Sequence, residues 1–161
     1  MRILSSTVLL LLAACGGIVT TSSGRPSEVQ DAPVRVLGQF QQAEWSEPDT
    51  VEIGNADAWR EAWARLQGGV TPLPPAPSVD LATERVLIVA AGMRPSGGFA
   101  YSFDRSRTTT EAVEVGLTLV SPGPRCSVAQ MLTSPAIALA VPRVPAGVAL
   151  QVKSRVQDCE G

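Results

Sequence analysis

Val86 to Ala91 is an unbroken run of six apolar residues, and it decides which layers the fold must contain. A strand with such a run has no polar face to give to solvent, so other elements must cover both of its faces. We therefore predict that residues 84–91 form a central strand. Shorter or alternating apolar segments predict further strands. These segments span residues 34–40, 51–53, 99–104, 113–119, 137–141 and 148–152.

Several details of these strands follow from single residues. In the first strand Val34, Val36 and Phe40 fall on one face, and Gly38 marks a bulge. Turns are expected at residues 46–49 and 106–110. Residues 92–98 lie between two predicted neighbouring strands, so we expect a hairpin loop there. Phe99, Tyr101 and Phe103 alternate on one face, and an exposed aromatic patch at these positions would indicate a small-ligand or structural module.

Residues 55–67 have the periodicity of a helix. Trp59, Trp63 and Leu66 fall on one face of it, Asn55 or Asp57 can cap its start, and Gly68-Gly69 ends it. We predict that the tryptophans pack into the core, and the alternative is an exposed binding platform. The Pro-rich residues 72–77 form a stiff, extended connector.

These elements predict an α+β domain with a mainly antiparallel sheet of six or seven strands and one packed helix, which a sandwich-like arrangement would satisfy. The chain has 161 residues, enough for one such domain. We place a single globular domain at residues 34–161, after a signal segment (1–14) and a tether (15–33). The tether is rich in Gly, Ser and Thr and is expected to be flexible.

The composition excludes several classes of function. The chain contains no histidine, which removes His-based acid–base catalysis and His-ligated zinc. Its net charge of −2 offers no basic surface for nucleic acid. Asp80, Glu84 and Asp104 are scattered acids, and nothing in the sequence brings two of them together for catalysis. We predict a protein that is not an enzyme and that uses no cofactor and no metal.

The N-terminus predicts secretion and a lipid anchor. Arg2 precedes a short apolar stretch that ends in Leu12-Ala13-Ala14-Cys15, the arrangement of a signal peptide. This ending resembles the bacterial lipobox, which implies lipidation of Cys15 and cleavage before it. Gly16 follows the cysteine, so in a cell with two membranes we expect the outer membrane. An ordinary signal peptide with an incidental cysteine is the alternative.

Cys126 and Cys159 are the other two cysteines. An even pair in an oxidising compartment predicts a disulfide. Closing this loop contributes roughly 3–4 kcal/mol to the free energy of unfolding in the chain-entropy account. Two free thiols are the alternative.

The densest unusual stretch is the loop Arg94-Pro95-Ser96-Gly97-Gly98-Phe99. Pro95 fixes its own φ, and the two glycines permit φ > 0, so the loop is expected to have a defined shape. The glycine N–H groups beside Arg94 could hold an anion. We predict that this loop binds a partner, and the alternative is a turn whose glycines serve geometry alone.

The helix with Trp59 and Trp63, the segment Val79-Asp80-Leu81 and the loop from Gly92 to Phe99 together resemble the PrcB-like family of bacterial envelope lipoproteins. Ser121-Pro122-Gly123 and Thr133-Ser134-Pro135 are also similar to its pattern, and the resemblance covers residues 50–142. The family often has an aromatic residue where this chain has Leu81, and a tyrosine where it has Phe99. The resemblance implies a non-catalytic envelope protein that binds, stabilises or helps to mature a protease.

A weaker similarity links residues 95–99 to the inhibitory loop of chagasin-like inhibitors of cysteine proteases, with Arg94 in place of that family's Asn. The sequence therefore predicts a lipid-anchored envelope module that binds another protein, with a protease as the favoured partner. A chagasin-like inhibitor and a structural or small-ligand-binding module are the alternatives.

Overall fold

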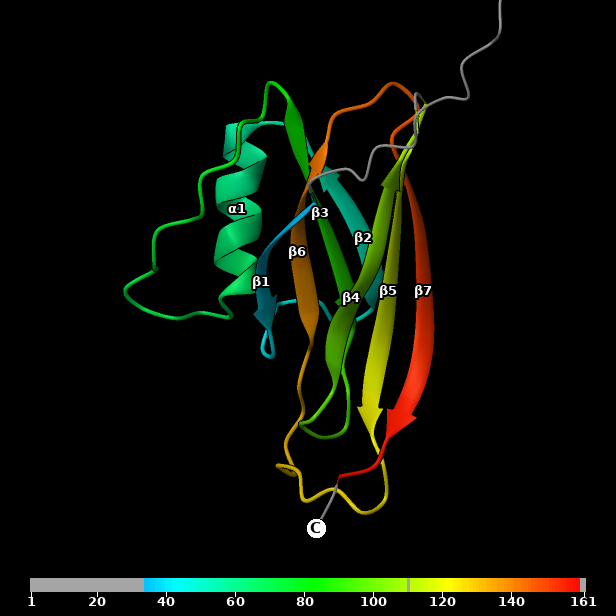
Figure 1. The fold of residues 1–161 in the computed structure, drawn as a ribbon. Helices are drawn as coiled ribbons and strands as arrows, with labels where there is room; N and C mark the ends of the chain where they lie inside the picture. Colours follow the sequence, from blue (N-terminus) through cyan, green and yellow to red (C-terminus); the bar gives the residue numbers. More distant parts are fainter. Residues whose placement is uncertain (1–33, 110, 160–161) are drawn as a thin grey trace, which may run out of the picture.

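A computed structural model describes residues 34–109 and 111–159. This part of the chain contains seven strands and one helix (Figure 1). In chain order they are β1 (Arg35–Phe40), β2 (Pro48–Ile53), α1 (Ala56–Leu66), β3 (Glu84–Ala91), β4 (Ala100–Thr108), β5 (Val113–Pro122), β6 (Ala136–Pro142) and β7 (Val148–Gln157). Residues 1–33, and with them the predicted signal peptide, lipidated Cys15 and tether, lie outside the described residues. The described part contains no helix with the length and apolar character to cross a membrane.

The strands form two sheets, with the order β1-β6-β3-β2 in one and β4-β5-β7 in the other. Figure 1 shows the helix on the outer side of the four-stranded sheet and the three-stranded sheet on its other side. The α+β, sandwich-like prediction is confirmed. Every pair is antiparallel except β5 and β7, which run parallel because the intervening strand β6 belongs to the other sheet.

Strand β3 is central, as its apolar run predicts. Val86, Ile88 and Ala90 belong to the core beneath the helix, whereas the alternate residues belong to the core between the two sheets. All six residues of the run are at most 3% exposed. Two apolar cores therefore share one strand, and no polar residue would be tolerated along it.

The helix begins and ends as predicted. The Asn55 side chain accepts a hydrogen bond from Ala58 N–H, and Gly68 follows the helix with φ of 56°. Trp59, Trp63 and Leu66 are buried, which confirms the packing prediction for the tryptophans.

The Pro-rich connector after the helix also supplies hydrogen-bond acceptors to the helix, which its stiffness alone does not predict. Trp63 Nε1 donates to the carbonyl of Pro74 at 2.8 Å, and Trp59 Nε1 donates to that of Pro77 at 3.2 Å. Proline carbonyls are good partners here because an extended connector leaves them without sheet partners. The connector thus satisfies both buried indoles and closes the helix-side core.

Some boundaries differ from the prediction. The predicted bulge at Gly38 is present, since the β1–β6 register shifts between Val36 and Gly38. This shift turns Leu37 and Phe40 toward the helix-side core and leaves Val36 46% exposed, so the predicted face of Val36 is wrong. The predicted turns at 46–49 and 106–110 are partly strand, because β2 pairs with β3 from Pro48 onward and β4 pairs with β5 as far as Thr108.

Candidate functional site

The predicted binding loop is not a hairpin. Strands β3 and β4 lie in different sheets, so the residues between them cross from one sheet to the other. The crossing ends beside the loop that joins β5 to β6 and near the C-terminal end of β7 (Figure 1). The hairpin expectation rested on sequence adjacency, which does not distinguish a turn within one sheet from a crossing between two.

Hydrogen bonds fix this crossing against the β5–β6 loop. Arg94 N–H donates to Thr133 O at 2.7 Å, and Thr133 N–H donates to Arg94 O at 3.0 Å. Thr133 Oγ1 donates to Ser96 O at 2.8 Å, and Gly97 N–H donates to Ala129 O at 2.8 Å. Two loops far apart in the sequence, residues 92–99 and 123–135, therefore form one hydrogen-bonded unit, which we call the loop pair.

The two glycines of the loop differ in what they do. Gly98 has φ of 86°, and a Cβ there would lie 2.8 Å from Val128 Cγ1, so this position requires glycine. Gly97 has ordinary φ, and its N–H is already used by Ala129. The predicted anion grip by both glycine N–H groups is therefore wrong for Gly97.

The Arg94 side chain turns inward. Its Nη2 donates to the carbonyl of Ala91 at 2.8 Å, and its Cζ lies 5.8 Å from the centre of the Phe99 ring. Its Nε is buried and has no hydrogen-bond partner among the described residues. Arg94 also lines a cleft of about 410 Å³ with Tyr101 and Leu119, between the two sheets. The arginine therefore supports the loop and faces the cleft.

Several large apolar side chains of the loop pair face outward. Met93, Met131 and Leu132 are 50%, 52% and 59% exposed. The antiparallel bridge of Arg94 to Thr133 sets Leu132 opposite Pro95. Of these residues sequence reasoning chose only Pro95, because residues 129–134 have no periodicity. Two adjacent large apolar residues in a segment without strand or helix pattern were the available signal.

The aromatic residues of β4 do not form an exposed patch. Tyr101 is 5% exposed, and Phe103 packs against the core between the sheets. Burial raises the pKa of the Tyr101 hydroxyl, and the nearby Arg94 guanidinium lowers it by a smaller amount. The small-ligand hypothesis that depended on an exposed aromatic face loses its main support.

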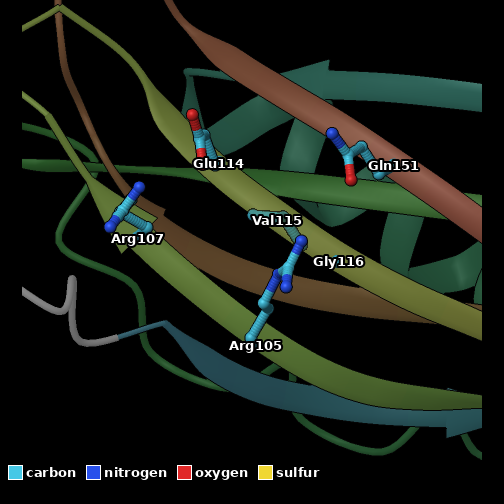
Figure 2. A pocket seen from close by; sticks show the side chains of 6 residues that line it. All are labelled: Arg105, Arg107, Glu114, Val115, Gly116 and Gln151. Carbon is cyan, nitrogen blue, oxygen red and sulfur yellow. The ribbon is translucent and has the colours of Figure 1, made fainter.

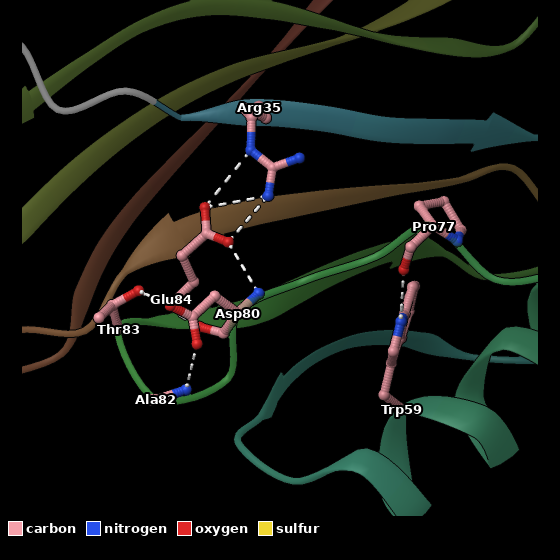
Figure 3. A network of polar contacts seen from close by, with 7 residues as sticks. All are labelled: Arg35, Trp59, Pro77, Asp80, Ala82, Thr83 and Glu84. Atoms are coloured by element: carbon pink, nitrogen blue, oxygen red, sulfur yellow. Dashed lines mark hydrogen bonds and ion pairs between the residues drawn. The ribbon is translucent and has the colours of Figure 1, made fainter.

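The scattered acids have structural partners. Glu84 accepts from Arg35 Nη2 at 3.0 and 2.8 Å, and it also accepts from Asp80 N–H at 3.2 Å (Figure 3). Asp80 itself caps the turn before β3 by accepting from Ala82 N–H and Thr83 Oγ1. Asp104 accepts from Thr118 Oγ1 at 2.7 Å. Within the described residues no three His, Cys, Asp or Glu side chains gather where a metal ion could bind.

The outer face of the three-stranded sheet has a hollow that Figure 2 shows from close by. It exists because Gly116 has no side chain, so that the stem of Arg105 lies across it, with Arg107, Glu114 and Gln151 around the rim. The cavity is about 20 Å³. That is room for about one water molecule, so this cavity by itself does not hold a larger ligand.

Cys126 and Cys159 form a disulfide pair with Cα atoms 4.9 Å apart, in agreement with the prediction. The pair ties the loop after β5 to the residues after β7. Arg125 and Asp158 make an ion pair of 3.1 Å beside it, and Gly123 N–H donates to Gln157 O at 2.8 Å. The disulfide therefore closes the same end of the domain that carries the loop pair.

With this geometry established, the comparison with protein families can be placed on the fold. Residues 85–142 match the family model described as PrcB C-terminal. This segment is similar to that family. The match runs from the second residue of β3 to the last residue of β6, so it contains the whole loop pair and the central strand. The resemblance predicted from the sequence is confirmed over residues 85–142, whereas the helix and residues 79–81 lie outside the match. No curated protein and no solved structure matches the chain.

Proposed function

We propose that this PrcB-like chain is a non-enzymatic, lipid-anchored module of the bacterial envelope that binds another protein, and that a protease or its precursor is the favoured partner. The family match supports the proposal in its coarse form. The lipobox-like Leu12-Ala13-Ala14-Cys15 supports the proposed lipid-anchored location in the envelope. One structural observation carries the binding role, and it concerns the loop pair.

That observation is the exposure of Met93, Met131 and Leu132 on loops that the framework holds rigidly. Clusters of large, exposed apolar side chains are rare on free protein surfaces. They are typical of surfaces that contact another protein. A surface that is already ordered pays little conformational entropy on binding. A partner that docks there in its folded state is stabilised by mass action.

The test is a crosslinked pull-down from native envelopes with the full-length lipoprotein. The loop variant carries Met131→Ser and Leu132→Ser. The matched control carries Val70→Ser and Leu73→Ser, which change two residues of similar exposure (52% and 45%) in the connector after α1. We expect the wild type and the control to recover the same protease, and the loop variant to lose it.

Equal recovery by the loop variant would remove the loop pair from the proposal. Recovery of no partner by any form would overturn the binding role itself. The membrane location is tested separately by Cys15→Ser. This change should release the chain from the membrane fraction, because the lipid on Cys15 supplies the anchor. A Cys15→Ser chain that stays membrane-bound would contradict the lipoprotein assignment.

A further inference from the structure

Strand β7 is the edge of the three-stranded sheet. All ten of its residues pair with β5, and no other strand of the described residues pairs with its second edge. Residues 151–157 are all exposed. A long edge of this kind is a template for another strand unless something blocks it.

The hydrogen bonds that β7 and its flanking residues make toward β5 identify which backbone groups face the free edge. Gly147 O accepts from Val113 N–H, and Gln157 O accepts from Gly123 N–H, so these odd-numbered residues direct their carbonyls toward β5. Alternate residues of a strand direct their backbone groups to opposite edges. The N–H and C=O groups of Val152, Ser154 and Val156 therefore face the free edge.

The inner face of β7 is apolar except at Ser154, and it is only partly covered. Val148 and Leu150 pack into the core between the sheets, but Val152 is 45% and Val156 67% exposed. Val152 also lines the cleft of about 410 Å³, which continues to Pro48 and Asp49 of β2 and to Arg94. That volume is in the range of ligand-binding clefts, and apolar side chains alternating along an added strand would enter it.

The outer face of the same strand is basic. Lys153 and Arg155 alternate with Val152, Ser154 and Val156, and neither makes an ion pair with a described residue. The Arg155 guanidinium contacts the Gln157 side-chain oxygen at 3.1 Å. A second copy of β7 paired on this edge would bring four like charges onto one face, which opposes self-association. Carboxylates on the incoming strand would instead complement them.

We propose that the free edge of β7 is a docking strand for an extended segment of a partner protein, in which apolar residues that enter the cleft alternate with acidic residues that face Lys153 and Arg155. The main-chain hydrogen bonds supply affinity, and the alternate side chains supply specificity. This surface is separate from the loop pair with its exposed Met93, Met131 and Leu132. The inference therefore goes beyond the proposed function and does not depend on it.

The probe is a fluorescent eight-residue peptide that alternates valine with glutamate, titrated onto the folded domain and followed by anisotropy. Its counterpart alternates valine with lysine. We expect the acidic peptide to bind roughly tenfold or more tightly than the basic one, because two facing cations favour it and oppose the other.

Two sets of variants locate the site. Ser154→Pro removes one N–H on the free edge without removing a bond to β5, and it should weaken acidic-peptide binding roughly tenfold. Ser154→Ala keeps that N–H and should bind like the wild type. Lys153→Glu with Arg155→Glu should reverse the preference in favour of the basic peptide. Circular dichroism checks that every variant is folded.

Equal binding of the two peptides by the wild type would overturn the proposal, as would a charge-reversed variant that keeps the acidic preference. If Ser154→Pro does not fold, the charge reversal alone decides. A wild-type dimer in sedimentation that Ser154→Pro dissociates would assign the edge to a second copy and overturn the peptide. The Met131→Ser/Leu132→Ser variant should bind the peptide normally, so failure here and failure of the loop-pair proposal remain distinguishable.

Discussion

Arg94 and Thr133 exchange two backbone hydrogen bonds, of 2.7 and 3.0 Å, although 39 positions separate them in the sequence numbering. This exchange joins the β3–β4 crossing to the β5–β6 loop. The Cys126–Cys159 disulfide closes the same loop a few residues earlier. The stability of that end of the domain therefore depends on both loops at once, and four measurements follow from it and from the two cores.

Removal of the disulfide should destabilise the domain. The change Cys126→Ala with Cys159→Ala should lower the free energy of unfolding by roughly 2–4 kcal/mol, because the crosslink restricts the unfolded chain. Chemical denaturation of the oxidised wild type and the variant measures it. Alkylation of the folded wild type without reductant is the control, and two labelled thiols would contradict the disulfide.

A methyl group at Gly98 should be costly. Gly98→Ala imposes a positive φ on a residue with a Cβ and brings that Cβ against Val128 Cγ1 and Pro122, so we expect a loss of roughly 1–3 kcal/mol. Gly69 is the matched control, since its φ is 78° and a Cβ there meets no atom within 4 Å. Thermal unfolding should show a smaller loss for Gly69→Ala, and equal losses would refute the steric part of the argument.

The indole hydrogen bonds to the connector should be measurable. Trp63→Phe removes the Nε1 donor to Pro74 and some buried volume, so we expect a loss of roughly 1–3 kcal/mol. In Trp45 the buried Nε1 has no partner among the described residues, so Trp45→Phe removes an unsatisfied donor and should cost less. Urea denaturation compares the two variants. A larger loss in the free energy of unfolding for Trp45→Phe than for Trp63→Phe would contradict the argument from the hydrogen bond.

Tyr101 should couple stability to alkaline pH. Burial raises the pKa of its hydroxyl in the folded protein, so its contribution is fully present below about pH 10 and is lost as the pH rises through the folded-state pKa. The chain has one tyrosine, so tyrosinate absorbance reports this group alone. We expect a higher midpoint in the folded than in the unfolded chain, and a further rise in Arg94→Met. A folded midpoint at or below the unfolded one would contradict the assignment.

The elements of the fold follow from local patterns in the sequence. The limits of β3 and the ends of α1 were predictable from local signals. These signals are the continuous apolar run of β3, Asn55 before the helix and the two glycines after it. The division of the strands between two sheets was not. Alternation tells which side chains share a face, but it does not tell which strand lies beside which.

The candidate site was predicted in part. The loop of residues 94–99 was identified from its Pro and Gly content, but its pairing with residues 129–134 is a long-range contact with no local signature. For the same reason Met131 and Leu132 were overlooked, and Arg94 was expected at the surface although its guanidinium lies against Ala91 O and the cleft. Strand β7 was predicted as far as residue 152, because Lys153 to Gln157 has little apolar content to mark it.

The position of β6 has a consequence for how the chain acquires its structure. Among the described residues β6 is the one strand that pairs with β1, and it also fills the second edge of β3. Until residues 136–142 have been synthesised, the apolar strand β3 has at most one neighbour in its sheet, and the first strand has none. Non-local pairings of this kind give a high contact order and slow folding. A nascent chain with this topology therefore cannot complete its four-stranded sheet before β6 emerges, and one edge of the central apolar strand stays accessible until then.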